Sequence, residues 1–312
     1  MTGTPLDRLL ARDGVVILDG GLGTELEQRG ADLSDPLWSA RLLADDPEAI
    51  VATHFGYYRA GAQVATTASY QASFQGFAAR GIDRQTAATL MRRSVELAIE
   101  ARRRYQAEDD ADADLLVAAS VGPYGAMLAD GSEYRGDYGL SVAQLRDFHG
   151  PRLAVLASSG ADLLAIETIP SVDEGRALVD LLADSRGMPA WLSFSCSDGG
   201  HTRQGDPIEE AFDLADGSPQ VIAVGINCTE PVHVEELVQR AAGRTTKPIV
   251  VYPNGGERWN AAGRQWTGQS DDLISTGVAA WLAAGARLIG GCCRVGPDTI
   301  ARIAAIARAQ RT

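Results

Sequence analysis

The stretch RLIGGCCRVGPDTIARI, residues 287–303, contains one complete strand–loop–helix unit. An apolar run around Leu288 and Ile289 ends in two glycines and two cysteines, and Pro297 follows shortly after. Proline is favoured at the first position of a helix, and the apolar residues after it recur at helical spacing. The stretch therefore predicts a buried strand, a short loop and a closing helix.

Seven further apolar runs precede this one, and helix-like segments separate them. One such segment opens with Asp46 and Pro47, a typical cap and first-turn pair. Eight strand–helix units predict an α/β fold, a single (β/α)8 TIM barrel formed as one domain by residues 1–312. A doubly wound open sheet is the alternative that periodicity leaves open. The predicted strands are residues 15–20, 63–69, 115–122, 163–170, 189–196, 221–228, 248–254 and 287–293.

The composition narrows the possible partners. The formal net charge is −13, and an acidic surface repels the phosphate backbone of nucleic acids. No apolar run approaches the roughly 18 residues of a membrane span, and the N-terminus lacks the apolar core of a secretory signal. We therefore expect a cytoplasmic protein that acts on small molecules, with no nucleic-acid or membrane partner. The sequence leaves the oligomeric state open.

Polar residues stand where the predicted strands end. The carboxyl ends of all barrel strands meet on one face, so side chains far apart in sequence converge there. Three long irregular stretches, residues 20–44, 123–140 and 253–270, also follow strand ends, and the third has the composition of a lid. The strand-end candidates are Asp19, Thr67, Glu167, Asn227, Cys228, Cys292 and Cys293.

Three of the four cysteines belong to this set. A disulfide between the neighbours Cys292 and Cys293 would need a strained ring, whereas Gly290 and Gly291 permit a turn that brings both thiols to one point. Together with Cys228 they would supply three thiolates, which suits Zn²⁺ and leaves a fourth coordination position open for catalysis.

Other interpretations compete with a zinc site. Buried cysteines often act as small hydrophobic residues, and Cys196, which also ends a strand, could replace one of the three ligands. A thiol redox sensor or a zinc-binding protein without turnover would use the same cysteines. A barrel glycosidase would pair Glu167 with Glu257. The start DGGLGTEL, residues 19–26, matches a dinucleotide loop only in part, because Leu26 stands in place of the third glycine.

The motifs DGGLGTEL, TTASYQAS, SVGPYG, IETIP, GINC, VYPNGGE and GGCC occur in an order that resembles the zinc-dependent homocysteine S-methyltransferases. The resemblance runs over nearly the whole chain, and GINC followed by GGCC is its most specific element. It is strongest to the stand-alone enzymes that use S-methylmethionine or S-adenosylmethionine as methyl donor.

This resemblance implies a role for each candidate residue. Cys228, Cys292 and Cys293 would hold Zn²⁺ and bring homocysteine to react as its thiolate, and Cys196 would not be a ligand. Asp19, next to Gly20, and Glu167 would receive the ammonium group of homocysteine. Thr67 would contact its carboxylate, and Asn227 would orient the loop that carries Cys228.

The resemblance also bears on the donor. Betaine-using relatives carry tyrosines where this chain has Gln71 and Thr168, which argues against betaine. Cobalamin-dependent relatives add modules that would follow GGCC, but this chain ends about one helix later. The sequence does not separate S-methylmethionine from S-adenosylmethionine, or homocysteine from selenocysteine as acceptor.

Overall fold

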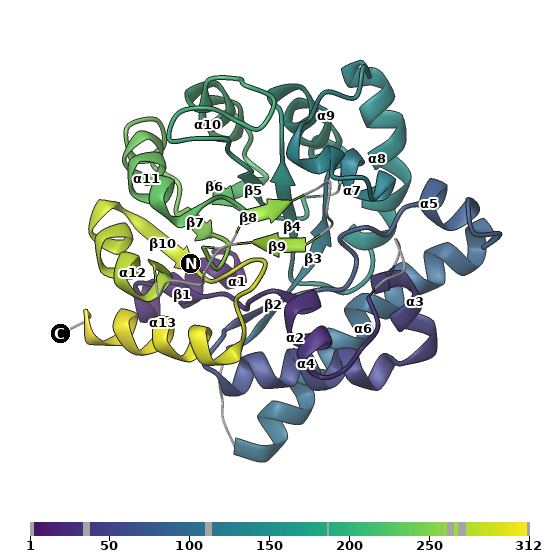
Figure 1. The fold of residues 1–312 in the computed structure, drawn as a ribbon, viewed down its shortest axis with the longest axis horizontal. Coiled ribbons are helices and arrows are strands. Elements are labelled where there is room, and N and C mark those ends of the chain that lie inside the picture. Colours follow the sequence, from purple (N-terminus) through teal and green to yellow (C-terminus); the bar gives the residue numbers. More distant parts are fainter. Residues whose placement is uncertain are drawn as a thin grey trace.

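The computed structural model describes residues 3–33, 38–109, 114–185, 187–256, 258–260, 265–267 and 273–310. Eight parallel strands form one sheet in the order β1-β10-β7-β6-β5-β4-β3-β2, which is the chain order around a ring (Figure 1). They are β1 (Val16–Ile17), β2 (Val64–Thr66), β3 (Leu116–Val121), β4 (Leu163–Ile169), β5 (Ala190–Phe194), β6 (Val221–Asn227), β7 (Ile249–Tyr252) and β10 (Ala286–Ile289).

The ring closes between β1 and β2. A parallel bridge joins Leu18 to Val64, and the Asp19 amide donates to the Val64 carbonyl at 3.1 Å. The Gln63 amide donates in turn to the Ile17 carbonyl at 2.7 Å. An open sheet would leave these two strands as unpaired edges, so the doubly wound alternative is wrong and the (β/α)8 barrel is confirmed. All eight predicted strands are present.

Helices follow the strands and surround the barrel (Figure 1). Asp46 caps α4 by accepting from the Ala49 amide at 3.1 Å, and Pro47 and Pro297 begin their helices as predicted. The elements after β1 to β4 are α2 (Leu22–Gln28), α3 (Trp38–Asp45), α4 (Pro47–Arg59), α5 (Phe74–Ala78), α6 (Arg84–Asp109), α7 (Tyr124–Leu128), η1 (Ser132–Tyr134), α8 (Val142–Ala157) and α9 (Val172–Ala183). After β5 to β10 come α10 (Ile208–Asp216), η2 (Pro231–His233), α11 (Val234–Ala242), the hairpin β8 (Arg258–Asn260) and β9 (Gln265–Thr267), α12 (Leu273–Ala284) and α13 (Pro297–Ala309).

The interior of the barrel is apolar at the N-terminal ends of the strands and polar at their C-terminal ends. Leu6 and Leu9 of α1 (Pro5–Asp13) pack with the inward side chains of the strands, among them Trp191. Successive inward positions along a strand lie two residues apart, so the inner side of β4 continues from Ala165 to Glu167. The apolar layers close the N-terminal end of the barrel, and the polar residues line its C-terminal end.

None of the helices in the described ranges is long and apolar enough to cross a membrane. The predicted lid at 253–270 is described in part and contains the hairpin β8–β9, and the glycosidase candidate Glu257 lies outside the described residues.

Candidate active site

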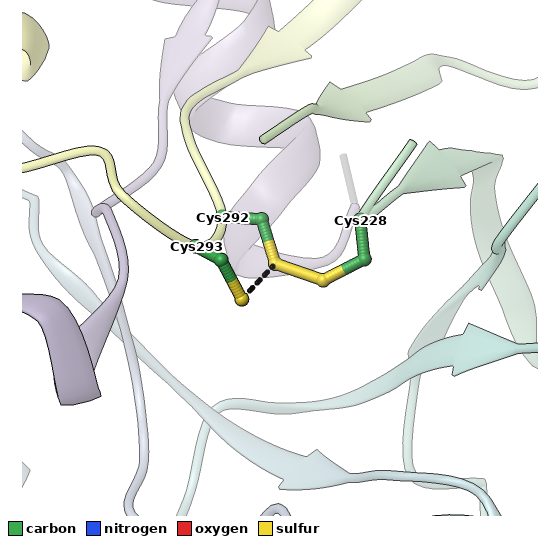
Figure 2. A group of neighbouring side chains, drawn as sticks. All are labelled: Cys228, Cys292 and Cys293. Carbon is green, nitrogen blue, oxygen red and sulfur yellow. Dashed lines mark hydrogen bonds between the residues drawn. A yellow bond between two sulfur atoms is a disulfide. The ribbon is translucent and has the colours of Figure 1, made fainter. Parts of the chain in front are cut away.

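Three thiols meet at the C-terminal end of the barrel. Cys228 follows β6, Cys292 and Cys293 follow β10, and their sulfur atoms lie within 4.8 Å of one another (Figure 2). Cys228 and Cys292 form a disulfide, and the Cys293 Sγ lies 4.0 Å from the Cys292 Sγ. Cys196 is a free, buried thiol and is not a member of this group. The structure thus brings together the three cysteines that were predicted to act together.

The end of β7 holds both cysteine-bearing loops. The Cys228 amide donates to the Tyr252 carbonyl at 3.2 Å, and the Cys292 amide donates to the Pro253 carbonyl at 2.8 Å. The Gly255 amide donates to the Cys293 carbonyl at 2.9 Å. Cys228 itself has a φ of +46°, a left-handed conformation that turns its side chain out of the strand. This local turn lets a thiol from β6 reach the thiols that follow β10.

Glycines after β1 allow a third loop to pack against this pair. A Cβ atom on Gly20 would lie 2.3 Å from the Val295 carbonyl oxygen, and one on Gly21 would lie 2.7 Å from the Cys292 carbonyl oxygen. The Gly291 amide also donates to the Asp19 carbonyl at 3.1 Å. These glycines therefore serve close backbone packing, which fixes Asp19 beside the cysteine loop.

Asp19 and Glu167 are buried carboxylates at the same end of the barrel. Asp19 accepts from the Thr66 amide at 2.7 Å and from the Thr66 hydroxyl at 2.9 Å, and Glu167 accepts from the Ser120 hydroxyl. Neither is paired with a cationic side chain in the part of the chain that the structure describes. Burial raises the pKa of Asp19 to about 8, with a contribution from the charge of Glu167. Burial raises the pKa of Glu167 to about 7. Two buried carboxylates without a cation form a site for a positively charged ligand.

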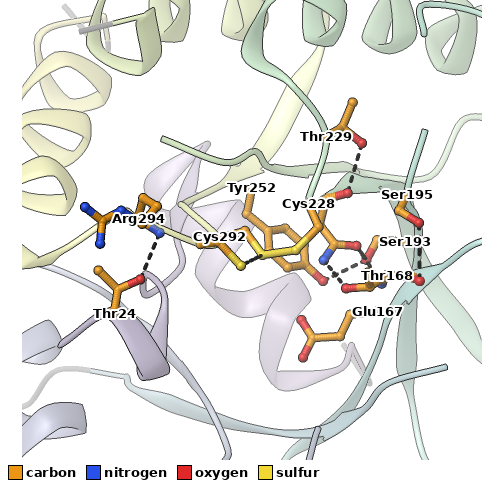
Figure 3. Close-up of a disulfide and its surroundings, with 12 residues drawn as sticks. Thr24, Glu167, Thr168, Ser193, Ser195, Cys228, Thr229, Tyr252, Cys292 and Arg294 are labelled. Atoms are coloured by element: carbon orange, nitrogen blue, oxygen red, sulfur yellow. Dashed lines mark hydrogen bonds between the residues drawn. A yellow bond between two sulfur atoms is a disulfide. The ribbon is translucent and has the colours of Figure 1, made fainter. Parts of the chain in front are cut away.

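The side-chain amide of Asn227 holds Thr168, the residue after Glu167, by hydrogen bonds. Its Oδ1 accepts from the Thr168 amide at 2.7 Å and from the Ser193 hydroxyl at 2.8 Å, and its Nδ2 donates to the Thr168 hydroxyl at 2.7 Å. Thr168 has a φ of +61°, which is rare for a β-branched residue. Figure 3 shows Thr168, Ser193 and Glu167 around Cys228.

The hydroxyl of Thr67 is buried and already bonded. It accepts from the Ser120 amide at 3.1 Å and lies 2.8 Å from the Ser69 hydroxyl. Ser69 donates its own proton to the Ser120 carbonyl at 2.7 Å, so the Thr67 proton must point to Ser69. The contact between Thr67 and a substrate carboxylate stays a prediction, and it would require this chain of hydroxyls to rearrange.

Sequence reasoning missed two tyrosines of the site. The Tyr252 hydroxyl accepts from Trp191 Nε1 at 2.9 Å, pairs with Ser193 at 2.7 Å and hydrogen-bonds to Glu167. Tyr134 forms a side-chain hydrogen bond with Cys293 from the turn η1. Tyr252 ends a run that reads as an apolar strand, and Tyr134 stands in a loop without periodicity. The inward alternation of β7 was the one available signal for Tyr252.

A closed barrel with a thiol cluster and two buried carboxylates at the C-terminal end of its strands has the architecture of a barrel enzyme, because barrel active sites lie at that end. The family model for homocysteine S-methyltransferase matches residues 16–307. The chain belongs to the homocysteine S-methyltransferase family and is an enzyme of that family, as the motifs predicted.

Relatives and solved structures agree with this assignment. The homocysteine S-methyltransferase of Escherichia coli (strain K12) is 49% identical over 303 residues, which are 96% of this chain and 98% of the relative. A selenocysteine Se-methyltransferase of Brassica oleracea var. italica is 47% identical and covers 93% of this chain and 88% of its own. The crystal structure of the homocysteine methyltransferase MmuM from Escherichia coli in its metallated form superposes with a TM-score of 0.89 at 48% identity, covering 97% of this chain and 100% of that one.

Proposed function

We propose that this enzyme transfers a methyl group from a sulfonium donor, S-methylmethionine or S-adenosylmethionine, to the sulfur of L-homocysteine and so forms methionine. The observation that carries the proposal is the cluster of three thiols within 4.8 Å of one another, beside the unpaired carboxylates of Asp19 and Glu167. Homocysteine has a thiol at one end and an ammonium at the other, which matches these two features. In this proposal residues 1–312 act as one homocysteine-binding domain in the cytoplasm.

The thiol cluster fits a zinc ion once the disulfide is reduced. Tetrahedral zinc binds thiolate sulfur at about 2.3 Å, which places two ligand sulfurs about 3.8 Å apart. The 4.0 Å between the sulfurs of Cys292 and Cys293 is close to that separation. The Escherichia coli relative has a metallated crystal form, which also supports a metal at this kind of site. Bound Zn²⁺ would lower the pKa of a coordinating thiol, so that homocysteine is present as a thiolate at neutral pH.

Asp19 and Glu167 would hold the other end of homocysteine. Burial disfavours their ionised forms, and an ammonium group placed between them would favour ionisation and form charge-assisted hydrogen bonds. Ser120 and Tyr252 keep the Glu167 carboxylate in place through side-chain hydrogen bonds. Fixing the amino acid at one end and its sulfur at the other aligns the sulfur for attack.

The methyl transfer itself moves no proton. A bond forms between the homocysteine sulfur and the methyl carbon, and the carbon–sulfur bond of the donor breaks with its electron pair left on the donor sulfur. The thiol proton is released to solvent when homocysteine binds, so the protein needs no general base. Because a thiolate and a sulfonium neutralise each other, the buried end of the barrel favours the transition state.

One observation favours a second candidate function. The disulfide between Cys228 and Cys292 is the expected oxidised form of a thiol redox sensor. A sensor of this kind would oxidise and reduce reversibly and would not turn over homocysteine.

The test is a methyl-transfer assay with reduced, zinc-loaded protein. Methyl-deuterated S-methylmethionine, S-adenosylmethionine and betaine are supplied separately, with homocysteine or selenocysteine as acceptor, and labelled product is followed by mass spectrometry. We expect label from a sulfonium donor and loss of activity with a chelator. Absence of label from every donor, with zinc still bound, would refute the methyltransferase and favour the sensor.

A further inference from the structure

Two charged side chains near the thiols have buried atoms without a partner. The Oε2 of Glu133 and the Nε of Arg203 are buried and accept or donate no hydrogen bond among the residues described. Arg135, close to Glu133 in sequence, donates instead to the Ser132 hydroxyl at 2.8 Å. A buried charged atom without a partner is costly, so two such atoms of opposite charge at one site point to a ligand that satisfies both.

Both residues are placed around Tyr134, next to the sulfur atoms. Glu133 and Tyr134 belong to the turn η1, and Tyr134 hydrogen-bonds to Cys293. The Arg203 guanidinium lies over the Tyr134 ring with its Cζ 5.5 Å from the ring centroid, and its Nη2 donates to the Cys228 carbonyl at 3.3 Å. A guanidinium therefore lies over one aromatic ring at the edge of the thiol cluster, and the preceding residue carries a carboxylate whose charge acts on Tyr134 and on Cys293.

The number of charged groups distinguishes the position of Glu133 and Arg203 from the proposed homocysteine site. Homocysteine carries one ammonium, which Asp19 and Glu167 already match in the proposed function. Glu133 adds a third carboxylate, and burial raises the pKa of Glu133 to about 7, as expected for a carboxylate that lacks a bound cation. A sulfonium amino acid brings the additional positive charge, and its own carboxylate is the natural partner of a guanidinium.

We infer that Glu133, Tyr134 and Arg203 form the methyl-donor subsite and select a sulfonium amino acid. This inference rests on the proposed methyl transfer. Glu133 faces the positive charge of the donor, Arg203 binds its carboxylate, and the Tyr134 ring, which is attractive to cations, lies beside the path to the acceptor sulfur.

The first test separates donor binding from acceptor binding. In the reduced, zinc-loaded full chain, Glu133→Gln should lower kcat/KM for S-methylmethionine roughly tenfold to a hundredfold, the usual effect of losing a hydrogen bond to a charged group. The KM for homocysteine should change less than about threefold, since that substrate binds elsewhere. Asp130→Asn is the matched control: it removes one negative charge from the same loop, where Asp130 accepts hydrogen bonds from the amide of Ser132 at 2.9 Å and from its side chain. An equal effect on both substrates, or an equal effect of Asp130→Asn, overturns the assignment.

The second test pairs Arg203 with the donor carboxylate. The wild-type enzyme should use (3-aminopropyl)dimethylsulfonium, which lacks the carboxylate, about tenfold or more less efficiently than S-methylmethionine. In Arg203→Gln the ratio of kcat/KM for the two donors should fall close to one, and the control Arg135→Gln should keep the wild-type ratio. Undiminished discrimination in Arg203→Gln overturns the inference.

The two variants test the subsite independently, so a folding defect in one leaves the other informative. Wild-type protein that transfers no methyl group from any sulfonium refutes the proposed function together with this subsite. An active wild type whose variants behave like it refutes the subsite alone.

Discussion

Replacing Asn227 by alanine tests how this barrel positions its site. Asn227 is fully buried and makes three hydrogen bonds of 2.7–2.8 Å, two of them to Thr168. Asn227→Ala leaves the Thr168 amide, the Thr168 hydroxyl and the Ser193 hydroxyl without this partner. At roughly 1 kcal/mol for each lost bond, and more for a buried donor left unpaired, we expect a loss of about 3–5 kcal/mol. That loss is a large part of the roughly 5–15 kcal/mol that stabilises a typical domain.

The same variant should impair homocysteine binding more than metal binding. Without Asn227, Thr168 is free to leave its left-handed conformation, which costs about 1–3 kcal/mol to hold. Glu167 precedes Thr168 directly and would move with it. Urea unfolding of the reduced, metal-free protein measures the stability, and steady-state kinetics measure the KM for homocysteine, which we expect to rise by about tenfold.

A double-mutant cycle identifies the cause. Glycine adopts a φ of +61° without the penalty of a β-branched residue, so Asn227→Ala should cost about 1–2 kcal/mol less when Thr168 is also replaced by glycine. Ser193→Ala, which removes one of the three bonds, is the graded control. A loss of unfolding free energy below about 1 kcal/mol for Asn227→Ala, or the same loss in both backgrounds, would refute the idea that Asn227 holds Thr168 in its left-handed conformation.

Four further predictions concern charge and metal. Glu167→Gln should raise the KM for homocysteine by about tenfold or more while zinc content, measured by atomic emission, stays at the wild-type level; loss of both would make the residue structural. Burial raises the pKa of Asp19 to about 8, above an unfolded value near 3.9, so its contribution to stability is complete below about pH 3.9 and is lost progressively between about pH 3.9 and about pH 8. Unfolding free energies of the ligand-free protein should accordingly fall over this range, and Asp19→Asn should flatten the slope; an unchanged slope would contradict the raised pKa. Serine in place of any of the three clustered cysteines should abolish stoichiometric zinc binding, whereas Cys196→Ser, outside the cluster, should leave it intact. The disulfide-bonded protein should titrate two free thiols, Cys196 and Cys293, and bind no zinc until a reductant is added; zinc uptake without reduction would refute the three-thiol site.

The sequence predicted the strands well because buried parallel strands are continuous apolar runs. The run at residues 248–254 contains β7 (Ile249–Tyr252), and the polar residues that follow such runs converge because all strands point the same way. The meeting of Cys228 with Cys292, 64 residues apart, follows from that geometry. The oxidation state of this pair is set by the surroundings of the protein, and no residue pattern encodes it.

Other features of the site depend on contacts that local pattern cannot show. Thr168 is the penultimate residue of the apolar strand β4 and has high strand propensity, yet it is left-handed because Asn227, 59 residues later, bonds both its amide and its hydroxyl. Glu133 and Tyr134 stand in a long loop, and their place beside the thiols follows from tertiary packing. For such residues the sequence gives the chemical type but not the position.

Three residues at or after the strand ends of this site have a left-handed backbone conformation. Each is a candidate functional residue or stands next to one in the sequence. Thr168 follows Glu167, Cys228 is one of the three thiols, and Arg294, with a φ of +68°, follows Cys293. A turn of this kind persists only where the surroundings hold it, and each one has a specific bond: Asn227 to Thr168, the Tyr252 carbonyl to the Cys228 amide, and the Thr24 hydroxyl to the Arg294 amide at 2.8 Å.

These bonds come from neighbouring strands and loops, so the conformation of each strand end depends on the closed barrel. The left-handed conformations therefore direct Glu167 and the thiols to one point before any ligand binds. Their conformational free energy is offset by the apolar packing at the N-terminal end of the barrel. A relaxed, extended backbone at the same three positions would send alternate side chains into the helix layer, away from the site.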